Sequence, residues 1–315
     1  MKKFLCLLLC LCCLLPLASG CGKRDDGKIT VLCTVFPLYD WVKNIVGESE
    51  TVEVSLLITN GSDLHSYQPS AEDIIRISSA DLFFYVGGSS DAWVEETLRT
   101  QASDERIDVK MTEIPEIRLR EMCIDSTAEH HDHDHGGMDE HLWLSLFNAK
   151  TASAYLTERL CELDEEDAET YRANFAAYAS SLDALDRDYA ALVSQSASPR
   201  MLCADRFPFV YLAEDYGISY ICAFEGCSTD ASASPETISR LATALNTYSL
   251  RCIVTTERPT AGLAESVRDA SVAKNQQILA LHSMQSVTEK EIRDGADYLN
   301  IMKQNLETLR RILGD

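Results

Sequence analysis

Basic residues are scarce in this sequence. Its 315 residues include 28 lysines and arginines against 50 aspartates and glutamates, a formal net charge of −22 at pH 7. Such a surface repels phosphate groups, so the composition argues against a nucleic-acid partner. It is typical of a solvated extracytoplasmic surface, or of a protein that attracts cations.

Common catalytic motifs are also missing. The sequence contains no HExxH, no GxSxG and no P-loop, the patterns typical of metalloproteases, serine hydrolases and nucleotide-binding enzymes. Beyond residue 20 it has no CxxC pair, so neither a redox motif nor a cysteine metal finger is expected. A zinc-dependent hydrolase that activates water on histidine-bound zinc remains an alternative.

Most of the twelve cysteines are not placed for disulfide bonds. Five lie in the first 21 residues, which leaves an odd number, seven, in the rest of the chain. One disulfide among these seven cysteines remains possible, although a chain of this length can bury a core without one. Four of the seven fall inside apolar strand-like runs, where a free cysteine behaves as a small hydrophobic residue: Cys33, Cys203, Cys222 and Cys252.

Residues 1–20 form a secretory signal that is not expected to be part of the fold. Lys2 and Lys3 precede the apolar run FLCLLLCLCCLL, which at a dozen residues is too short for a stable transmembrane helix. Small residues then lead to Cys21, as in the lipobox of bacterial lipoproteins; plain secretion after cleavage is the alternative. Residues 21–28 would provide a lipidated cysteine and a polar tether that anchor the protein to the membrane.

Residues 29–147 alternate short β-rich runs with helix-like ones. Strands that alternate with helices predict a parallel sheet, so we expect an N-terminal α/β lobe here. The expected strands are 29–35, 52–58 and 80–88, and the expected helices are 39–47, 69–80 and 93–101.

Residues 164–195 carry apolar side chains at alternating steps of three and four, and no glycine or proline interrupts them. This spacing indicates a helix with a heptad seam, inside a helical connection at 148–197. Such a helix would be about 45 Å long, which is the size of a domain. It is either a dimerisation helix or a rigid spine that joins two lobes.

Residues 198–315 return to the alternation of strands and helices. The predicted fold class is therefore α/β, with two parallel-sheet lobes joined by one long rigid helix. A ligand site in such a fold lies beyond the carboxyl ends of the strands, in the cleft between the lobes. The expected strands are 199–205, 218–224, 251–257 and 277–283, and the expected helices are 207–216, 235–248, 260–274 and 289–312.

Three histidines occupy positions where that site is expected. His65 follows the second strand, His282 ends the last one, and His141 lies in DEHLWLS, where a polar loop gives way to an apolar run. Three imidazoles and a water molecule are a common zinc arrangement, so we predict that they converge in the cleft. Any one of them alone is equally compatible with a hydrogen-bonded structural histidine.

The other four histidines lie in a polar loop, residues 129–137, interleaved with aspartates and followed by glycines: His130, His131, His133 and His135. Such a tract binds transition metals weakly and in many geometries. Ordering it costs conformational entropy, so it is predicted to be an auxiliary metal loop and not the high-affinity site. A solvated loop without a role is the alternative.

Four stretches carry a family resemblance: FPLYDWVKNIVG (36–47), GSDLHSYQPSAEDIIRISSADLFFYVGG (61–88), DEHLWLS after the acidic loop (139–145) and FVYLAEDYGI (209–218). They resemble the metal-binding lipoproteins that supply zinc or manganese to ABC importers, and the resemblance covers nearly all of residues 28–312. It implies two α/β lobes joined by a rigid helix, with a metal in the cleft. It also implies a lipid-anchored protein that delivers its metal to an ABC permease, and we expect this protein to be a monomer.

By that resemblance, His65 and His141 fall on the family's two N-lobe ligands, and His282 falls where an aspartate ligand is usual. Arg206 falls on the position of a further ligand, and an arginine has no lone pair to offer. We expect that Asp205 or a water molecule replaces this ligand, or that the site has one ligand fewer.

Three imidazoles favour Zn²⁺ as the bound ion over Mn²⁺, because nitrogen ligands suit zinc and manganese prefers carboxylates. Manganese and iron remain alternatives. The predicted function is capture and delivery of the metal, without catalysis. A surface adhesin that uses the 164–195 helix is a further alternative, and it would require an exposed seam.

Overall fold

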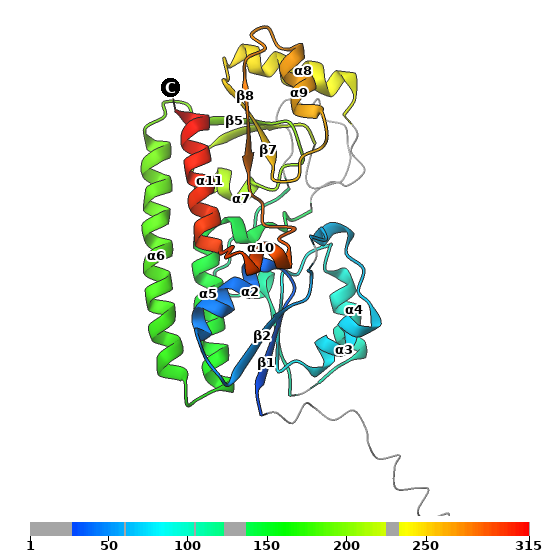
Figure 1. Cartoon of the computed structure of the whole chain (residues 1–315), viewed down its shortest axis with the longest axis vertical. Helices are drawn as coiled ribbons and strands as arrows, with labels where there is room; N and C mark the ends of the chain where they lie inside the picture. Colours follow the sequence, from blue (N-terminus) through cyan, green and yellow to red (C-terminus); the bar gives the residue numbers. More distant parts are fainter. Residues whose placement is uncertain (1–26, 60, 104, 123–136, 225–232, 315) are drawn as a thin grey trace, which may run out of the picture.

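The computed structural model describes residues 27–59, 61–103, 105–122, 137–224 and 233–314. They form two α/β lobes stacked along the long axis of the molecule, with the N-terminal lobe at the bottom of Figure 1 and the C-terminal lobe above it. The signal segment and Cys21 lie outside the described residues. Among the residues described, no helix is long and apolar enough to cross a membrane.

The N-terminal lobe is built on a sheet of four parallel strands in the order β2-β1-β3-β4. The three predicted strands and three predicted helices are confirmed, and β4 is an addition that was not predicted. The capping box formed by Ser70 and Asp73 starts α3 two residues after the expected proline. The elements are β1 (Ile29–Cys33), α2 (Phe36–Val46), β2 (Val52–Leu56), α3 (Ala71–Ser79), β3 (Leu82–Tyr85), α4 (Ala92–Thr100) and β4 (Ile107–Lys110).

The C-terminal lobe repeats this plan, with four parallel strands in the order β6-β5-β7-β8. All four of its predicted strands are confirmed. The single helix expected at 289–312 is wrong, because Gly295 has a φ of 94° and Asp297 caps a new helix. The elements are β5 (Arg200–Cys203), α7 (Val210–Asp215), β6 (Ser219–Cys222), α8 (Pro235–Thr247), β7 (Cys252–Thr256), α9 (Leu263–Ala270), β8 (Gln277–Leu281), α10 (Glu289–Arg293) and α11 (Tyr298–Leu313).

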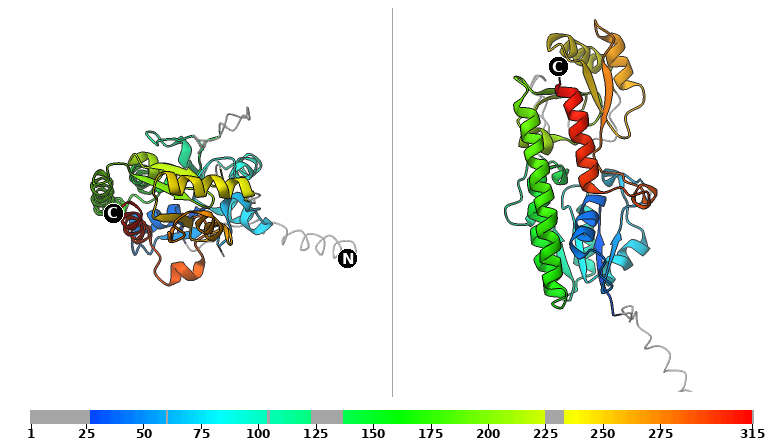
Figure 2. Two further views of the ribbon diagram at one scale, coloured as in Figure 1. Left: turned by 90° about the horizontal axis from the view of Figure 1, so that it is seen from above. Right: turned by 60° about the vertical axis from the view of Figure 1, so that its left-hand side comes forward.

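The long helix α6 (Ala168–Ser194) runs beside both lobes, next to α5 (Leu146–Leu163) and α11 (Figures 1 and 2). Its seam is buried against α5, α2 and α11 of the same chain, so it is not an exposed surface for a second copy. Asn174 donates to the Ile45 carbonyl of α2 at 2.9 Å, and Tyr189 donates to the Met302 carbonyl of α11 at 2.6 Å. The helix is thus fastened to both lobes, as a spine requires. Its buried seam residues are Tyr171, Tyr178, Leu182, Leu185, Tyr189 and Leu192.

The core is continuous across the lobes, with one large cluster that draws on β1, α2, α5, α6, α7 and α11. The four cysteines expected inside strands are buried and reduced, and Cys161 is buried as well. Burial raises the pKa of the Cys33 thiol far above its usual range. These cysteines pack as small apolar groups.

Candidate metal centre

His65 is positioned by a short turn at the carboxyl end of β2. The turn is a 3₁₀ helix, η2 (Leu64–Ser66), and Asp63 caps it by accepting the His65 backbone N–H at 3.0 Å. This is the edge of a parallel sheet at which ligand sites form. The sequence prediction for the location of His65 is therefore met.

His141 occupies the N-cap position of a second 3₁₀ helix, η4 (Leu142–Leu144), and is 1% exposed. Asp139 Oδ1 accepts both the backbone N–H and the ring Nδ1–H of His141, each at 2.9 Å. An ionised carboxylate can only accept, so the Nδ1 of His141 carries the proton. Its Nε2 therefore presents a lone pair, which is the arrangement that metal-binding histidines use.

The two imidazoles meet at these ring nitrogens. His65 Nε2 lies 3.2 Å from His141 Nε2, with the ring centroids 5.2 Å apart. Two nitrogens bound to one tetrahedral zinc ion at about 2.0–2.1 Å are separated by about 3.3 Å. The pair therefore has the spacing of two neighbouring zinc ligands, and a shared proton or a cation satisfies both nitrogens.

The opposite side of the His65 ring faces two groups that the sequence analysis did not identify. His65 Nδ1 lies 2.7 Å from Ser90 Oγ and 3.5 Å from Glu140 Oε2. Glu140 is 5% exposed, and its Oε1 accepts from Ser89 Oγ at 2.7 Å and from the Ser90 backbone N–H at 2.8 Å. Two features of the sequence could have identified these groups: the serine pair that follows Gly87 and Gly88, just after β3, and the carboxylate next to His141.

Burial raises the pKa of Glu140, but the hydrogen bonds from Ser90 and Ser89 outweigh it and leave that pKa below its usual range. The same loop needs glycine at position 88, where an added Cβ would lie 2.4 Å from Glu140 Oε1. Asp91 accepts the Gly87 backbone N–H at 2.9 Å and closes the loop. Burial, reinforced by the charge of Glu140, raises the pKa of Asp91 to about 6.

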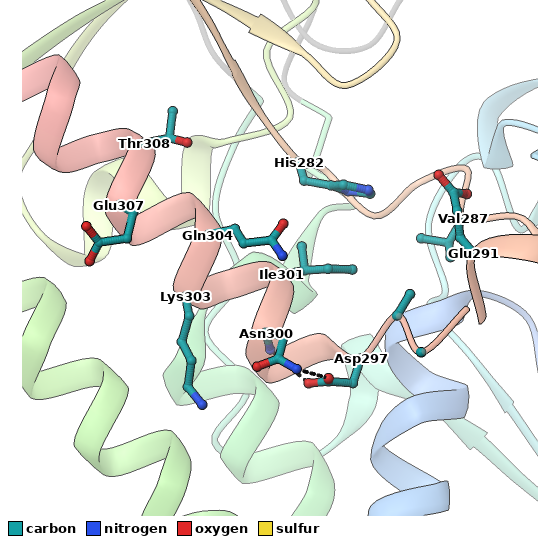
Figure 3. Close-up of a pocket in the computed structure, with 12 residues that line it drawn as sticks. His282, Val287, Glu291, Asp297, Asn300, Ile301, Lys303, Gln304, Glu307 and Thr308 are labelled. Carbon is teal, nitrogen blue, oxygen red and sulfur yellow. Dashed lines mark hydrogen bonds between the residues drawn. The ribbon is translucent and has the colours of Figure 1, made fainter. Parts of the chain in front are cut away.

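His282 is arranged differently. Its side chain is 25% exposed and lines a pocket of about 710 Å³ between the segment after β8 and α11, where Figure 3 shows its ring directed toward Val287 and Glu291. Its Nδ1 accepts the Met284 backbone N–H at 3.0 Å and lies 3.6 Å from Glu257 Oε1. The neutral ring therefore carries its proton on Nε2, the reverse of His141.

The convergence of all three histidines is not seen. Within the residues that the structure describes, no group of three or more His, Cys, Asp or Glu side chains is placed to hold a metal ion. The structure brings His65 and His141 together and leaves His282 in its own pocket. The role of each as a ligand stays a prediction.

Asp205, the proposed substitute ligand, is wholly buried in the C-terminal lobe. Its oxygens accept from the backbone and hydroxyl of Thr256, at 3.1 and 2.7 Å, and from those of Thr260, at 3.3 and 2.9 Å. It also accepts the Arg206 backbone N–H at 2.9 Å. This carboxylate is committed to fastening the segment after β7, which favours a structural role for Asp205.

Arg206 reaches across to the N-terminal lobe, where its Nη1 donates to Asp63 Oδ2 at 2.7 Å. Burial raises the pKa of Asp63, but the His65 backbone N–H and the Arg206 guanidinium hold it below its usual range. Arg206 thus binds the residue that caps the His65 turn. The position that the family resemblance assigns to a ligand is occupied by an interlobe ion pair.

Two aromatic residues join the His141 segment to the C-terminal lobe. Trp143 Nε1 donates to the Ser283 carbonyl at 2.8 Å, one residue beyond His282. Tyr298 at the start of α11 donates to the Trp143 carbonyl at 2.6 Å. The N-lobe pair is therefore mechanically linked to the segment that carries His282.

The four auxiliary histidines lie in 123–136, outside the described residues. Residues that flank this segment are paired, since Glu121 and Met138 form an antiparallel bridge and Met122 N–H donates to the Gly137 carbonyl at 2.9 Å. Asp139 follows at once, with its N–H bound to the Arg120 carbonyl at 2.9 Å. The described residues on either side of that segment therefore lie close to each other and lead directly into the His141 turn.

The sequence and the fold both have known relatives. The chain is 31% identical over 319 aligned positions to the zinc-binding lipoprotein AdcA of Streptococcus pneumoniae, with 99% of this chain and 61% of that protein covered. It is 28% identical to the high-affinity zinc uptake system protein ZnuA of Bacillus subtilis, with 97% and 94% covered. The chain therefore spans about 61% of the length of the first relative.

Solved structures agree on the fold. The Zn(II)-bound ZnuA-like domain of S. pneumoniae AdcA matches 92% of this chain and all of that chain, with a TM-score of 0.75 and 27% identity. TroA from Treponema pallidum, at 22% identity and a TM-score of 0.73, has the same fold. The sequence profile of one family, described as zinc-uptake complex component A, periplasmic, matches residues 31–312. With nine-tenths of its length matched by that profile, this chain belongs to the zinc-uptake component A family.

Proposed function

We propose that this protein is an extracytoplasmic solute-binding protein that captures Zn²⁺ and delivers it to an ABC permease. The observation that carries the proposal is the His65–His141 pair, with its two ring nitrogens 3.2 Å apart. Two nitrogen donors at this spacing suit zinc better than manganese, which prefers carboxylates. Zinc-binding names and Zn(II)-bound structures among its relatives support the same ion.

Capture begins at this pair and is completed from the C-terminal lobe. His282 is proposed as the third ligand, and it joins after its ring gives up the bond from the Met284 N–H. This requires a local movement of the segment after β8, which is held at Ser283 by Trp143 and Glu257, because the lobes themselves are held by α6. A water molecule fills the fourth position, because Asp205 is already committed to Thr256 and Thr260.

Delivery places the protein outside the cytoplasm at a membrane. Lipidation of Cys21 is proposed as the anchor, with residues 21–28 as the tether. The protein is proposed to act as a monomer, since the seam of α6 is buried within its own chain. The histidine loop at 129–137 would collect zinc when the metal is scarce, and release of zinc to the permease involves no chemical step.

The test is a competitive titration of metal-stripped protein, residues 22–315, against Zn²⁺ and Mn²⁺ with a chelator of known affinity. It is repeated on His65→Ala and on a deletion of residues 129–137. One tight zinc site that is lost in His65→Ala and kept in the loop deletion is expected. Tighter binding of Mn²⁺ would identify manganese as the cargo, and a site that disappears only with the loop would contradict the proposal.

Hydrolase activity is the remaining alternative, and the same samples address it. Protein loaded with zinc is screened against ester, amide and phosphoester substrates, with and without chelator. No chelator-sensitive turnover is expected, because binding and transport need no general base beside the metal. Turnover that is lost in His65→Ala would replace the transport proposal with an enzymatic one.

A further inference from the structure

The proposed zinc ligands bring no negative charge to the site. His65, His141 and His282 are all neutral when they coordinate a metal. Arg206 adds a positive charge at the position where the resemblance places a further ligand. A divalent cation held by such a set depends on the nearest carboxylates to offset its charge.

Most carboxylates near the histidines are already engaged. Asp139 accepts two N–H groups of His141, and Asp63 is paired with Arg206. Glu257 accepts the backbone N–H and the hydroxyl of Ser283, each at 2.8 Å. These acids hold neighbouring segments in place through the hydrogen bonds and the ion pair that they form.

Glu140 differs from them. One of its oxygens, Oε1, is held by Ser89 and Ser90, whereas Oε2 is buried and has no hydrogen-bond partner in the described part of the chain. That second oxygen lies 3.5 Å from His65 Nδ1. A buried carboxylate oxygen left without a hydrogen bond costs free energy, so its position needs a compensating interaction.

We propose that Glu140 is a positioning residue for the zinc site. Acting directly and through the Ser90 hydroxyl, it keeps the proton of His65 on Nδ1, so that the Nε2 lone pair faces His141. Its carboxylate also supplies the negative charge that the three imidazoles and Arg206 do not provide. This inference rests on the proposed function and adds to it the residue that sets the affinity of the site.

The tautomer argument follows from the contacts of the ring. Ser90 Oγ and Glu140 Oε2 both lie on the Nδ1 side of His65, and a carboxylate accepts hydrogen bonds but does not donate them. A proton on Nδ1 satisfies this side and leaves Nε2 able to bind metal. Asp139 does the same for His141, so each member of the pair is supported by its own carboxylate.

The experiment measures zinc affinity and the His65 tautomer in three variants of residues 22–315. Glu140→Gln removes the charge and places an amide N–H₂ toward Nδ1, whereas Glu140→Asp keeps the charge. Ser90→Ala removes the hydroxyl that contacts His65 Nδ1. Asp40→Asn is the matched control, because Asp40 is a buried acid of the same lobe whose contacts are with Asn44 and Tyr298. Thermal unfolding of each metal-free variant checks that it is folded.

Glu140→Gln is expected to weaken zinc binding about 10–100-fold, the usual loss for a residue that supports a ligand. Nitrogen NMR shifts should show the His65 proton moving from Nδ1 toward Nε2. Glu140→Asp should recover most of the affinity, Ser90→Ala should lose part of it, and Asp40→Asn should match the parent protein.

Two results would overturn the proposal and leave the zinc function standing: an affinity for Glu140→Gln within twofold of the parent, or Glu140→Asp as weak as Glu140→Gln. Failure of the proposed function has a different signature. In that case His65→Ala, measured alongside, keeps the tight zinc site. If Glu140→Gln does not fold, Ser90→Ala and Glu140→Asp decide, and parental values of both affinity and tautomer in Ser90→Ala contradict the positioning role.

Discussion

The two lobes share one plan of four parallel strands, yet they differ in how ready their histidines are for a metal. The N-terminal lobe holds His65 and His141 with their Nε2 atoms 3.2 Å apart. In the C-terminal lobe, His282 accepts a backbone N–H, and Arg206, at the position where the family resemblance places a ligand, pairs with Asp63. Under the proposed function, one lobe therefore supplies a preformed half-site, and the other must rearrange to complete it.

The difference has a simple physical origin. Each N-lobe histidine lies on a short turn, with a carboxylate on the Nδ1 side of its ring. A donor pair fixed in advance loses little entropy when the ion arrives, and this raises affinity. His282 instead accepts a backbone N–H on its Nδ1, so its ring must break a hydrogen bond before it joins the ion. Such an asymmetry suits a protein that must release the metal it binds.

The largest effect is expected from breaking the preformed half-site. His65→Ala should weaken zinc binding by more than about 100-fold, beyond the range for supporting residues, because it removes a donor. His282→Ala should cost clearly less, since that ring must first give up its bond to Met284. Chelator competition measures the zinc affinity of both variants, and equal losses of affinity would contradict the asymmetry between the lobes.

Asp139→Asn tests whether the carboxylate sets the tautomer of His141. The amide can turn its N–H₂ group toward Nδ1 and so favour the proton on Nε2, which blocks coordination. Zinc affinity should fall about 10–100-fold while the variant stays folded. Asp63→Asn, an equally conservative change near the other histidine, should lower the affinity less, because Asp63 accepts from the backbone N–H of His65 and not from its ring.

Asp40 tests the contact between α2 and α11. It accepts from the Tyr298 backbone N–H at 3.2 Å, and burial raises its pKa to about 7, against about 3.9 in an unfolded chain. Between these two values the folded state binds more protons, so its stability falls as pH rises through this window and levels off above pH 7.

Asp40→Asn should remove that dependence. Relative to the variant, the parent protein should lose about 2 kcal/mol of unfolding free energy between pH 5 and pH 8, as an order of magnitude. Denaturant unfolding of the metal-free proteins at the two pH values measures it. The same pH dependence in both proteins would show that Asp40 is not the group responsible.

Substitution of Arg206 has the smallest expected effect, and it tests the contribution of the C-terminal lobe to zinc binding. Arg206→His removes a positive charge and offers an imidazole at the position of the missing ligand, so zinc affinity should rise about tenfold or less, at most 1.4 kcal/mol. Arg206→Lys keeps the charge and should match the parent. The ion pair with Asp63 is about one-fifth exposed on each side and adds at most about 1 kcal/mol to stability. A weaker site in Arg206→His would mean that the ion pair holds the half-site in place.

Much of the fold could be predicted because its signals are local. The alternation around β1, β2 and β3 and the period of α6 follow from residues a few positions apart. β4 was missed because its IDVK run is short and polar. The helical connection predicted at 148–197 covers most of α5, but the bounds of α5 were not predicted because its mixed sequence lacks a clear period. The break between α10 and α11 depends on the conformation of one glycine, which helical spacing does not reveal.

The sequence by itself determined the two lobes, the spine and the family, and it predicted which histidines lie at the ends of strands. Pattern and composition suffice to predict these features, because each depends on residues that are close together in the sequence. Only the tertiary structure decided that His65 meets His141, that Glu140 and Ser90 support the pair, and that Asp205 is committed to threonines. Hydrogen bonds join residues 25 to 76 positions apart at this site, and no local pattern records which distant groups share a proton.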